Sequence, residues 1–235
     1  MGQELRAGHQ GTGPGEFTPD GCAVELYGRL PVGTEPDVIA AAVPAGARIL
    51  ELGSGAGRVT HPLVARGFDV TAVDESAAML ARIRGARTVR ASIGELDLGE
   101  RFDVVMLASF LVHAPEPEER QLLLRACRRH VADGGCVLLQ REGEGWHEDL
   151  PRERESAGGR ISVVSSEPVG DGVRSVHVVY DYPDARWTQT FLSRPLTIED
   201  FEQALRDAHL ALDAYLTPDR VWVRAVPGDA LPSIP

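Results

Sequence analysis

The stretch ARILELGSGAGRVTHPLVARGFDVTAVDES, residues 47–76, decides the fold. An apolar run at 48–52 leads into three glycines two positions apart, and a second apolar run ends on Asp74. Glycines at a strand tip let the backbone and a helix N-terminus approach a ligand, and an acid at the next strand tip can hold ribose hydroxyls. Asp74 lies 23 positions after Glu51, close to the roughly 20-residue spacing of such an acid. The stretch therefore predicts a strand–helix–strand unit that binds a nucleoside.

The spacing of the glycines indicates which nucleoside is bound. A dinucleotide-binding fold has the pattern G-x-G-x-x-G, whereas this chain has Glu51-x-Gly53-x-Gly55-x-Gly57. The pattern resembles motif I of the class I S-adenosylmethionine (SAM) dependent methyltransferases. It disfavours an NAD(P)-dependent oxidoreductase, which we keep as a weaker alternative.

Three further segments resemble the same family in the same order. AVDES (72–76) is similar to its segment after motif I, and RFDVVMLASFLVH (101–113) to its fourth strand, whose tip faces the reacting methyl group. LLLRACRRHVADGGCVLLQ (122–140) is similar to its next helix, glycine turn and fifth strand. The resemblance covers about residues 36–141 and returns at 196–226. It implies an α/β fold: a doubly wound, Rossmann-like, seven-stranded sheet with the last strand antiparallel.

The pattern changes after the fifth expected strand. Three strand-like runs, 160–166, 173–182 and 186–193, are separated by turn residues and predict an inserted antiparallel meander. Such an insertion resembles the sugar N,N-dimethyltransferases and the glycine N-methyltransferase-like group, which act on small molecules. We expect a mobile tail at 1–15, a SAM-binding core at 16–141 and 195–228, and a loop and meander at 142–194 that form an acceptor lid or a dimer surface.

The resemblance also implies which residues contact SAM. Asp74 is expected on the ribose and Glu51 near the methionine portion, with Arg58 or Arg29 near the methionine carboxylate. Ser92 and Ile93 stand where the family often has Gly-Asp, a departure that affects the adenine contact. The full set is Tyr27, Arg29, Glu51, Gly53, Ser54, Gly55, Gly57, Arg58, Asp74, Glu75, Met79, Ser92, Ile93, Ala108 and Ser109.

His113 follows the fourth expected strand, where the methyl acceptor should lie. Imidazole titrates near neutrality, so His113 is the candidate catalytic base. The alternative is a loop histidine satisfied by the backbone. The acid- and histidine-containing segment 142–149 matches no rigid metal site, and we expect no metal.

The composition removes several function classes. All 24 basic residues are arginine, and the chain has no lysine and no asparagine. Schiff-base chemistry and a P-loop therefore have no lysine to use. A net charge of −11 disfavours a nucleic-acid partner. Three cysteines without a secretion signal or membrane segment predict a cytoplasmic protein with reduced thiols.

We therefore predict a SAM-dependent methyltransferase that modifies N, O or C of a small-molecule acceptor, in secondary metabolism. A homodimer stays open. The alternatives are a SAM-fold enzyme with cyclase or lyase chemistry, or a SAM-binding regulatory module.

Overall fold

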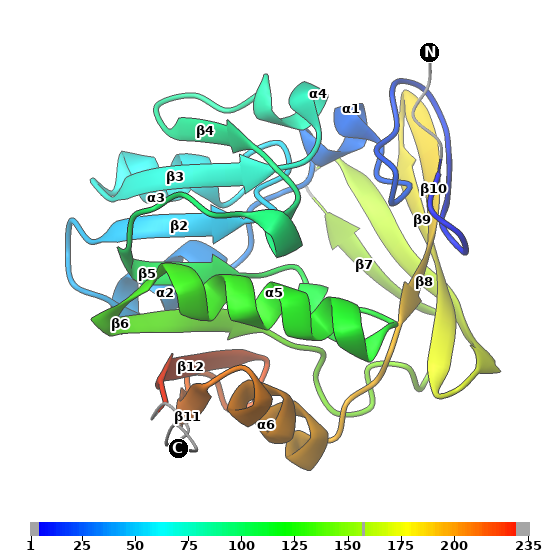
Figure 1. Cartoon of the computed structure of the whole chain (residues 1–235). Helices are drawn as coiled ribbons and strands as arrows, with labels where there is room; N and C mark the ends of the chain where they lie inside the picture. Colours follow the sequence, from blue (N-terminus) through cyan, green and yellow to red (C-terminus); the bar gives the residue numbers. More distant parts are fainter. Residues whose placement is uncertain (1–4, 157, 229–235) are drawn as a thin grey trace. The chain divides into compact units, whose positions relative to one another are not determined.

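The computed structural model describes residues 5–156 and 158–228 (Figure 1). The chain divides into two compact units. We call residues 33–144 and 196–228 the core unit, and residues 5–32 and 145–195 the meander unit.

The core unit contains a seven-stranded sheet of order β11-β12-β6-β5-β2-β3-β4. Strands β6, β5, β2, β3 and β4 are parallel, and β12 pairs antiparallel with both β6 and β11. This confirms the predicted doubly wound sheet with an antiparallel last strand. The strands are β2 (Arg48–Leu52), β3 (Asp69–Asp74), β4 (Arg87–Arg90), β5 (Phe102–Leu107), β6 (Val131–Gln140), β11 (Leu210–Tyr215) and β12 (Trp222–Pro227).

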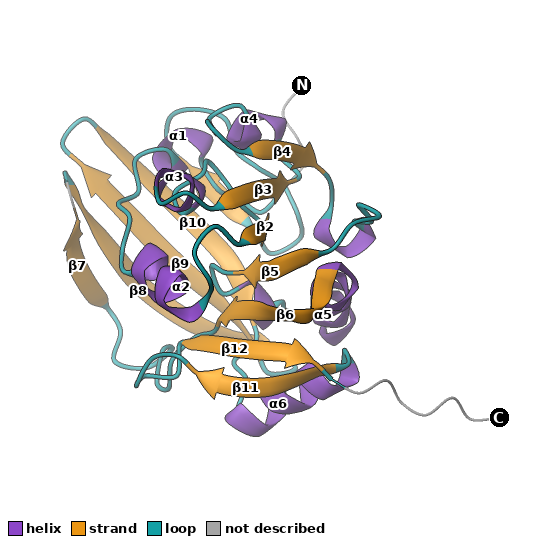
Figure 2. Ribbon diagram, turned by 90° about the vertical axis from the view of Figure 1, so that its left-hand side faces the viewer, coloured by secondary structure: helices purple, strands orange, loops and turns teal. Residues whose placement is uncertain are grey.

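Helices cover both faces of this sheet (Figure 2). One apolar cluster joins the strands to α5 and α6, and a second joins them to α2 and α3. Side chains of β5 residues 104–107 enter the clusters alternately, which explains why this part of the strand is a continuous apolar run. The helices are α2 (Glu35–Ala42), α3 (Thr60–Ala65), α4 (Ala77–Leu80), α5 (Pro117–His130) and α6 (Ile198–Asp207), with 3-10 turns η1 (Ile93–Glu95) and η2 (Leu111–His113).

The meander unit contains a five-stranded antiparallel sheet of order β1-β10-β9-β8-β7. Tyr180 of β9 lies opposite Trp187 of β10 in the register, and both belong to the apolar cluster of this unit. A one-turn helix, α1 (Val24–Tyr27), adds Leu26 to the same cluster. The strands are β1 (Gln10–Thr12), β7 (Arg152–Ser156), β8 (Gly159–Gly170), β9 (Val173–Tyr182) and β10 (Ala185–Ser193).

The structure corrects three details of the expected organisation. Residues 10–12, expected in a mobile tail, form edge strand β1, and residues 152–156, expected in a loop, form β7. An edge strand can form through backbone hydrogen bonds without a row of apolar side chains. The charged sequence RERES of β7 therefore does not show the apolar pattern from which strands are predicted. Residues 16–32, expected in the core, group with the meander unit instead.

The described part of the chain has no helix that is both long and apolar enough to cross a membrane. Cys22, Cys127 and Cys136 are all buried and unbridged. Burial raises the pKa of the Cys127 thiol to about 12.

Candidate functional site

The glycine loop lies at the carboxyl end of β2, where Gly53 and Gly57 have φ values of +74° and +87°. The amides of Gly53 and Ser54 both donate to the carbonyl of Val73, at 2.9 Å each. A Cβ atom on Gly53 would lie 2.6 Å from Leu111 Cδ1. The positive φ favours glycine at position 53, and any larger residue would also displace the end of the Leu111 side chain.

Asp74, at the end of β3, holds the glycine loop in place. Its Oδ2 accepts a hydrogen bond from the Gly55 amide and its Oδ1 from the Ser76 amide, both at 2.8 Å. The Ser76 hydroxyl in turn accepts from the amide of Met79, which caps α4. A carboxylate oxygen can accept more than one hydrogen bond, so this bracing is compatible with ribose hydroxyls on the same group.

Glu51 is a buried carboxyl group directly before the loop. It is 4% exposed, and its Oε2 accepts a hydrogen bond of 2.5 Å from the Thr60 hydroxyl. Burial raises the pKa of Glu51 to about 7, against the lowering by Thr60 and by the Arg58 charge. A carboxyl group with this pKa is poised to ionise when a cation binds beside it.

The loop and its surroundings fit a nucleoside cofactor with a cationic end. Glycine backbone can approach the ligand, Asp74 lies at the tip of the neighbouring strand, and Glu51 offers a carboxylate. The Ser54 hydroxyl is buried and has no hydrogen-bond partner among the described residues. An orphaned buried hydroxyl inside such a loop is a group that a ligand can satisfy.

Arg58 has an acceptor within the protein. Its Nη1 lies 2.5 Å from Glu35 Oε1, 23 residues earlier in the chain. Burial acts to raise the pKa of Glu35, but the charge and hydrogen bond of Arg58 outweigh it, and the pKa is lowered. A contact of Arg58 with the methionine carboxylate stays a prediction. For this contact, Arg58 would have to leave Glu35 or bind both carboxylates at once.

The remaining predicted residues of the core unit lie at the carboxyl ends of β3, β4 and β5. Met79 is 2% exposed, Ser92 is exposed ahead of η1, and Ile93 is half-buried against the core. Glu75 accepts a hydrogen bond from Arg90 Nε through its backbone carbonyl. Carboxyl ends of parallel strands meet at one edge of the sheet, so these residues share the edge that holds the glycine loop.

A strained turn follows β5 at the same edge. Ser109 and Phe110 have φ values of 55° and 63°, and neither is glycine. The Ser109 amide donates to Gln140 Oε1 at 2.9 Å, and Gln140 is itself buried at the end of β6. Two successive left-handed residues cost free energy and cluster at functional sites. Sequence reasoning included Ala108 and Ser109 but missed Phe110 and Gln140, since no turn residue marks them.

His113 is buried rather than open, at 3% exposure. Its Nε2 accepts a hydrogen bond from the Glu142 amide at 2.9 Å, and its Nδ1 lies 3.3 Å from Glu142 Oε2. A proton on Nδ1 satisfies both contacts. This geometry matches the backbone-satisfied alternative better than a general base, because the basic lone pair of Nε2 is already engaged.

Tyr27 and Arg29 belong to the meander unit, and both have partners there. Arg29 donates to both carboxylate oxygens of Asp184 and to Glu25, each at 2.9 Å. The hydroxyl of half-buried Tyr27 donates to Gln189 Oε1 at 3.4 Å. Their contacts with SAM stay predictions.

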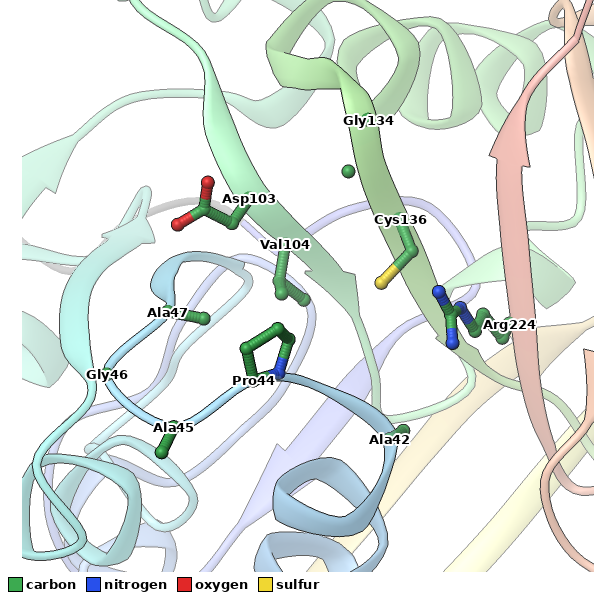
Figure 3. A pocket seen from close by; sticks show the side chains of 11 residues that line it. Ala42, Pro44, Ala45, Gly46, Ala47, Asp103, Val104, Gly134, Cys136 and Arg224 are labelled. Carbon is green, nitrogen blue, oxygen red and sulfur yellow. The ribbon is translucent and has the colours of Figure 1, made fainter.

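A separate hollow of about 390 Å³ lies at the amino ends of β5 and β6 (Figure 3). Cys136, Arg224 and Asp103 line it together with Ala42, Pro44, Ala45, Gly46, Ala47, Val104, Gly134 and Gly135. Cofactors of open α/β sheets bind at the carboxyl ends of the strands. The hollow is therefore at the wrong end of the sheet to be the predicted site.

Comparison with known proteins agrees with this geometry. Residues 49–135 match the family described as a methyltransferase domain. The ubiquinone biosynthesis O-methyltransferase of Pseudomonas aeruginosa (strain UCBPP-PA14) is 32% identical over 105 residues, covering 40% of this chain and 44% of the relative. The enzyme of the same description from Caulobacter sp. (strain K31) is 33% identical over 108 residues, covering 40% of each chain. The chain thus spans less than half the length of these curated relatives.

Solved structures share the fold over most of the chain. The CcbJ methyltransferase from Streptomyces caelestis has a TM-score of 0.71 at 19% identity, covering 88% of this chain and 96% of that one. A SAM-bound amino pentose methyltransferase from Micromonospora echinaspora, involved in calicheamicin biosynthesis, has a TM-score of 0.65 at 22% identity, covering 88% and 92%. A sugar N-methyltransferase from Streptoalloteichus has a TM-score of 0.61 at 23% identity, covering 88% and 87%. These similarities confirm the predicted fold.

Proposed function

We propose that this chain, whose residues 49–135 match the methyltransferase domain family and whose fold is similar to that of a solved methyltransferase, binds SAM and methylates a small-molecule acceptor. The observation that carries the proposal is the glycine loop after β2, braced by Asp74 and adjoining the buried Glu51. Its anionic groups and backbone amides suit the ribose and the cationic end of SAM.

The names of the structural neighbours support a small acceptor. They include an amino pentose methyltransferase and a sugar N-methyltransferase, and the curated relatives are O-methyltransferases. An amine or hydroxyl acceptor, and a role in secondary metabolism, are the finer parts of this proposal. The function of the meander unit as an acceptor lid or dimer surface also stays a prediction.

The chemistry makes few demands on the protein. The glycine loop, Asp74 and Glu51 would hold SAM, which would supply an activated methyl group for an acceptor lone pair, with the cofactor sulfur as leaving group. The chain then has to align the acceptor and exclude water. The Ser109–Phe110 turn, held by the hydrogen bond from Ser109 to Gln140, lies at the tip of β5 where the acceptor is expected. An amine acceptor that is neutral at the working pH needs no base, which agrees with the engaged nitrogens of His113.

Calorimetric titration with S-adenosylhomocysteine tests the cofactor, with NADH as the control ligand. The two acids at the ends of β3 provide matched variants. Asp74→Asn removes one loop-bracing acceptor, and we expect at least tenfold weaker binding. Asp69→Asn, whose side chain is 74% exposed at the far end of the strand, should bind within twofold of the wild type. Binding of NADH alone, or equal binding by Asp74→Asn, would contradict the proposed site.

Product analysis separates methyl transfer from the alternative SAM chemistries. S-adenosylhomocysteine as product supports methyl transfer, whereas methylthioadenosine indicates a reaction of the SAM side chain. Tight binding with neither product across amine and phenol acceptors would favour the regulatory-module alternative.

A further inference from the structure

A row of side chains on one face of the core sheet ends in two arginines. Leu139 of β6, Val223 of β12 and Tyr215 of β11 lie opposite one another in the register. All three pack with the cluster that α6 covers. Arg141 is two residues after Leu139, and its guanidinium carbon lies 5.4 Å from the Phe201 ring of α6. Arg141 therefore continues this row at the carboxyl edge of the sheet.

Arg141 is a buried cation with incomplete hydrogen bonding. It is 5% exposed, and its Nη2 donates to the carbonyl of Leu196 at 3.0 Å. Its Nε is buried and has no hydrogen-bond partner among the described residues. No carboxylate of the described chain forms an ion pair with it. A buried charge left in this state is costly unless something else completes its bonding.

A second arginine approaches the same place from the β11–β12 loop. The Arg141 amide donates to the carbonyl of Val221 at 2.8 Å, so Arg220 is one residue from that contact. Arg220 has a left-handed φ of 57°, and its guanidinium carbon lies 5.5 Å from the Tyr215 ring. Among the described residues Arg220 makes no ion pair and no side-chain hydrogen bond. Burial lowers the pKa of Arg141, and the like charge of Arg220 acts in the same direction.

We propose that Arg141 and Arg220 bind one oxyanion, a carboxylate or phosphate group carried by the methyl acceptor, with the Tyr215 ring positioning Arg220. Arginine forks match the planar or tetrahedral oxygens of such groups. The location agrees with this assignment, because the carboxyl edge of β6 belongs to the same sheet edge as the glycine loop. The inference rests on the proposed methyltransferase function only in naming the acceptor as the carrier of the anion.

The neighbouring acids have other partners. Glu202 accepts a hydrogen bond from the Tyr215 hydroxyl at 3.2 Å, and Glu142 contacts His113. Glu144 is exposed and acts on Arg141 less strongly than Glu142 or Arg220 does. Burial and the bond to Glu202 raise the pKa of Tyr215, which keeps its hydroxyl neutral. The two guanidiniums therefore keep donors for an incoming anion.

Titration of the whole chain with inorganic phosphate, followed by ³¹P NMR line width at constant ionic strength, tests the site. We expect saturable millimolar binding by the wild type and at least tenfold weaker binding by Arg220→Ala. Tyr215→Phe keeps the ring under Arg220 and should weaken binding less. The matched control is Arg125→Ala, an exposed arginine of α5, which should bind as the wild type does. Displacement by acetate marks a site that also takes carboxylates, and resistance to acetate marks one for phosphate.

The same samples are titrated with S-adenosylhomocysteine, so that the two proposals fail separately. In one outcome the wild type binds phosphate, Arg220→Ala does not, and S-adenosylhomocysteine does not bind. This outcome would support the anion site and contradict the methyltransferase proposal. In the other outcome S-adenosylhomocysteine binds, but phosphate either does not bind or binds equally to Arg220→Ala and Arg125→Ala. This outcome would overturn the anion site alone.

Discussion

At the scale of single residues, Glu51 shows how folding changes one ionisable group. The side chain leaves water on β2, and its pKa rises from 4.5 to about 7. Between these two values the folded chain binds more protons at this site than the unfolded chain does. The contribution of Glu51 to the free energy of unfolding therefore falls as the pH rises from 4.5 to about 7.

Replacing this carboxyl by an amide should remove the pH dependence. Glu51→Gln keeps an acceptor for Thr60. As pH rises from 4 to 8, we therefore expect the free energy of unfolding of this variant to increase by roughly 3 kcal/mol relative to that of the wild type. Urea unfolding of both proteins across this range measures the difference. Glu95→Gln, at an exposed position, is the control. Parallel curves for Glu51→Gln and the wild type would show that Glu51 is not perturbed.

His113 is a second residue whose burial makes a definite prediction. His113→Ala leaves the Glu142 amide and carboxylate without their ring partner, and should lower the free energy of unfolding by about 1–3 kcal/mol. His113→Gln keeps an acceptor, and its free energy of unfolding should fall less. Urea unfolding together with the pH profile of methylation separates the roles. A roughly 100-fold lower rate with unchanged stability would restore the catalytic base.

Sequence predicted the residue types of the site better than their partners. The glycines and Asp74 were identifiable because their function depends on local spacing. Arg58 pairs with Glu35 and Arg29 with Asp184, which are distant in sequence, so no local pattern could name these two partners.

At the scale of elements, buried strands were the most predictable part of the fold. The β5 residues 104–107 are all apolar because both faces of the strand are covered there. The edge strands β1 and β7 were missed because they form through backbone pairing, with β10 and β8 respectively. Helix α4 is only the single turn Ala77–Leu80.

Helix α6 begins with a side-chain cap at Thr197, and this contact is testable. The Thr197 hydroxyl accepts from the Asp200 amide at 3.0 Å and donates to its carboxylate at 2.7 Å. Thr197→Ala should lower the free energy of unfolding by about 1 kcal/mol. Thr197→Ser retains the hydroxyl and should lose much less. Equal losses in the two variants would assign the effect to the methyl group instead.

At the scale of the whole molecule, ligand binding should stabilise the folded chain. S-adenosylhomocysteine at 100 times its Kd should add about 3 kcal/mol, which corresponds to a Tm rise of roughly 5–10 °C for a chain of this size. Differential scanning calorimetry measures the shift, and Asp74→Asn at the same ligand concentration should show a smaller one. If the two units melt separately, only the transition of the core unit should move. A rise with NADH of the same size would contradict a selective site.

The burial of the three cysteines has a consequence for handling the protein. Thiolate is the form that attacks disulfides and alkylating reagents, and all three cysteine residues are buried. Intact molecules therefore resist air oxidation and covalent cross-linking to one another. A band at twice the monomer mass on a non-reducing gel would then come from chains that had unfolded before the disulfide between them formed.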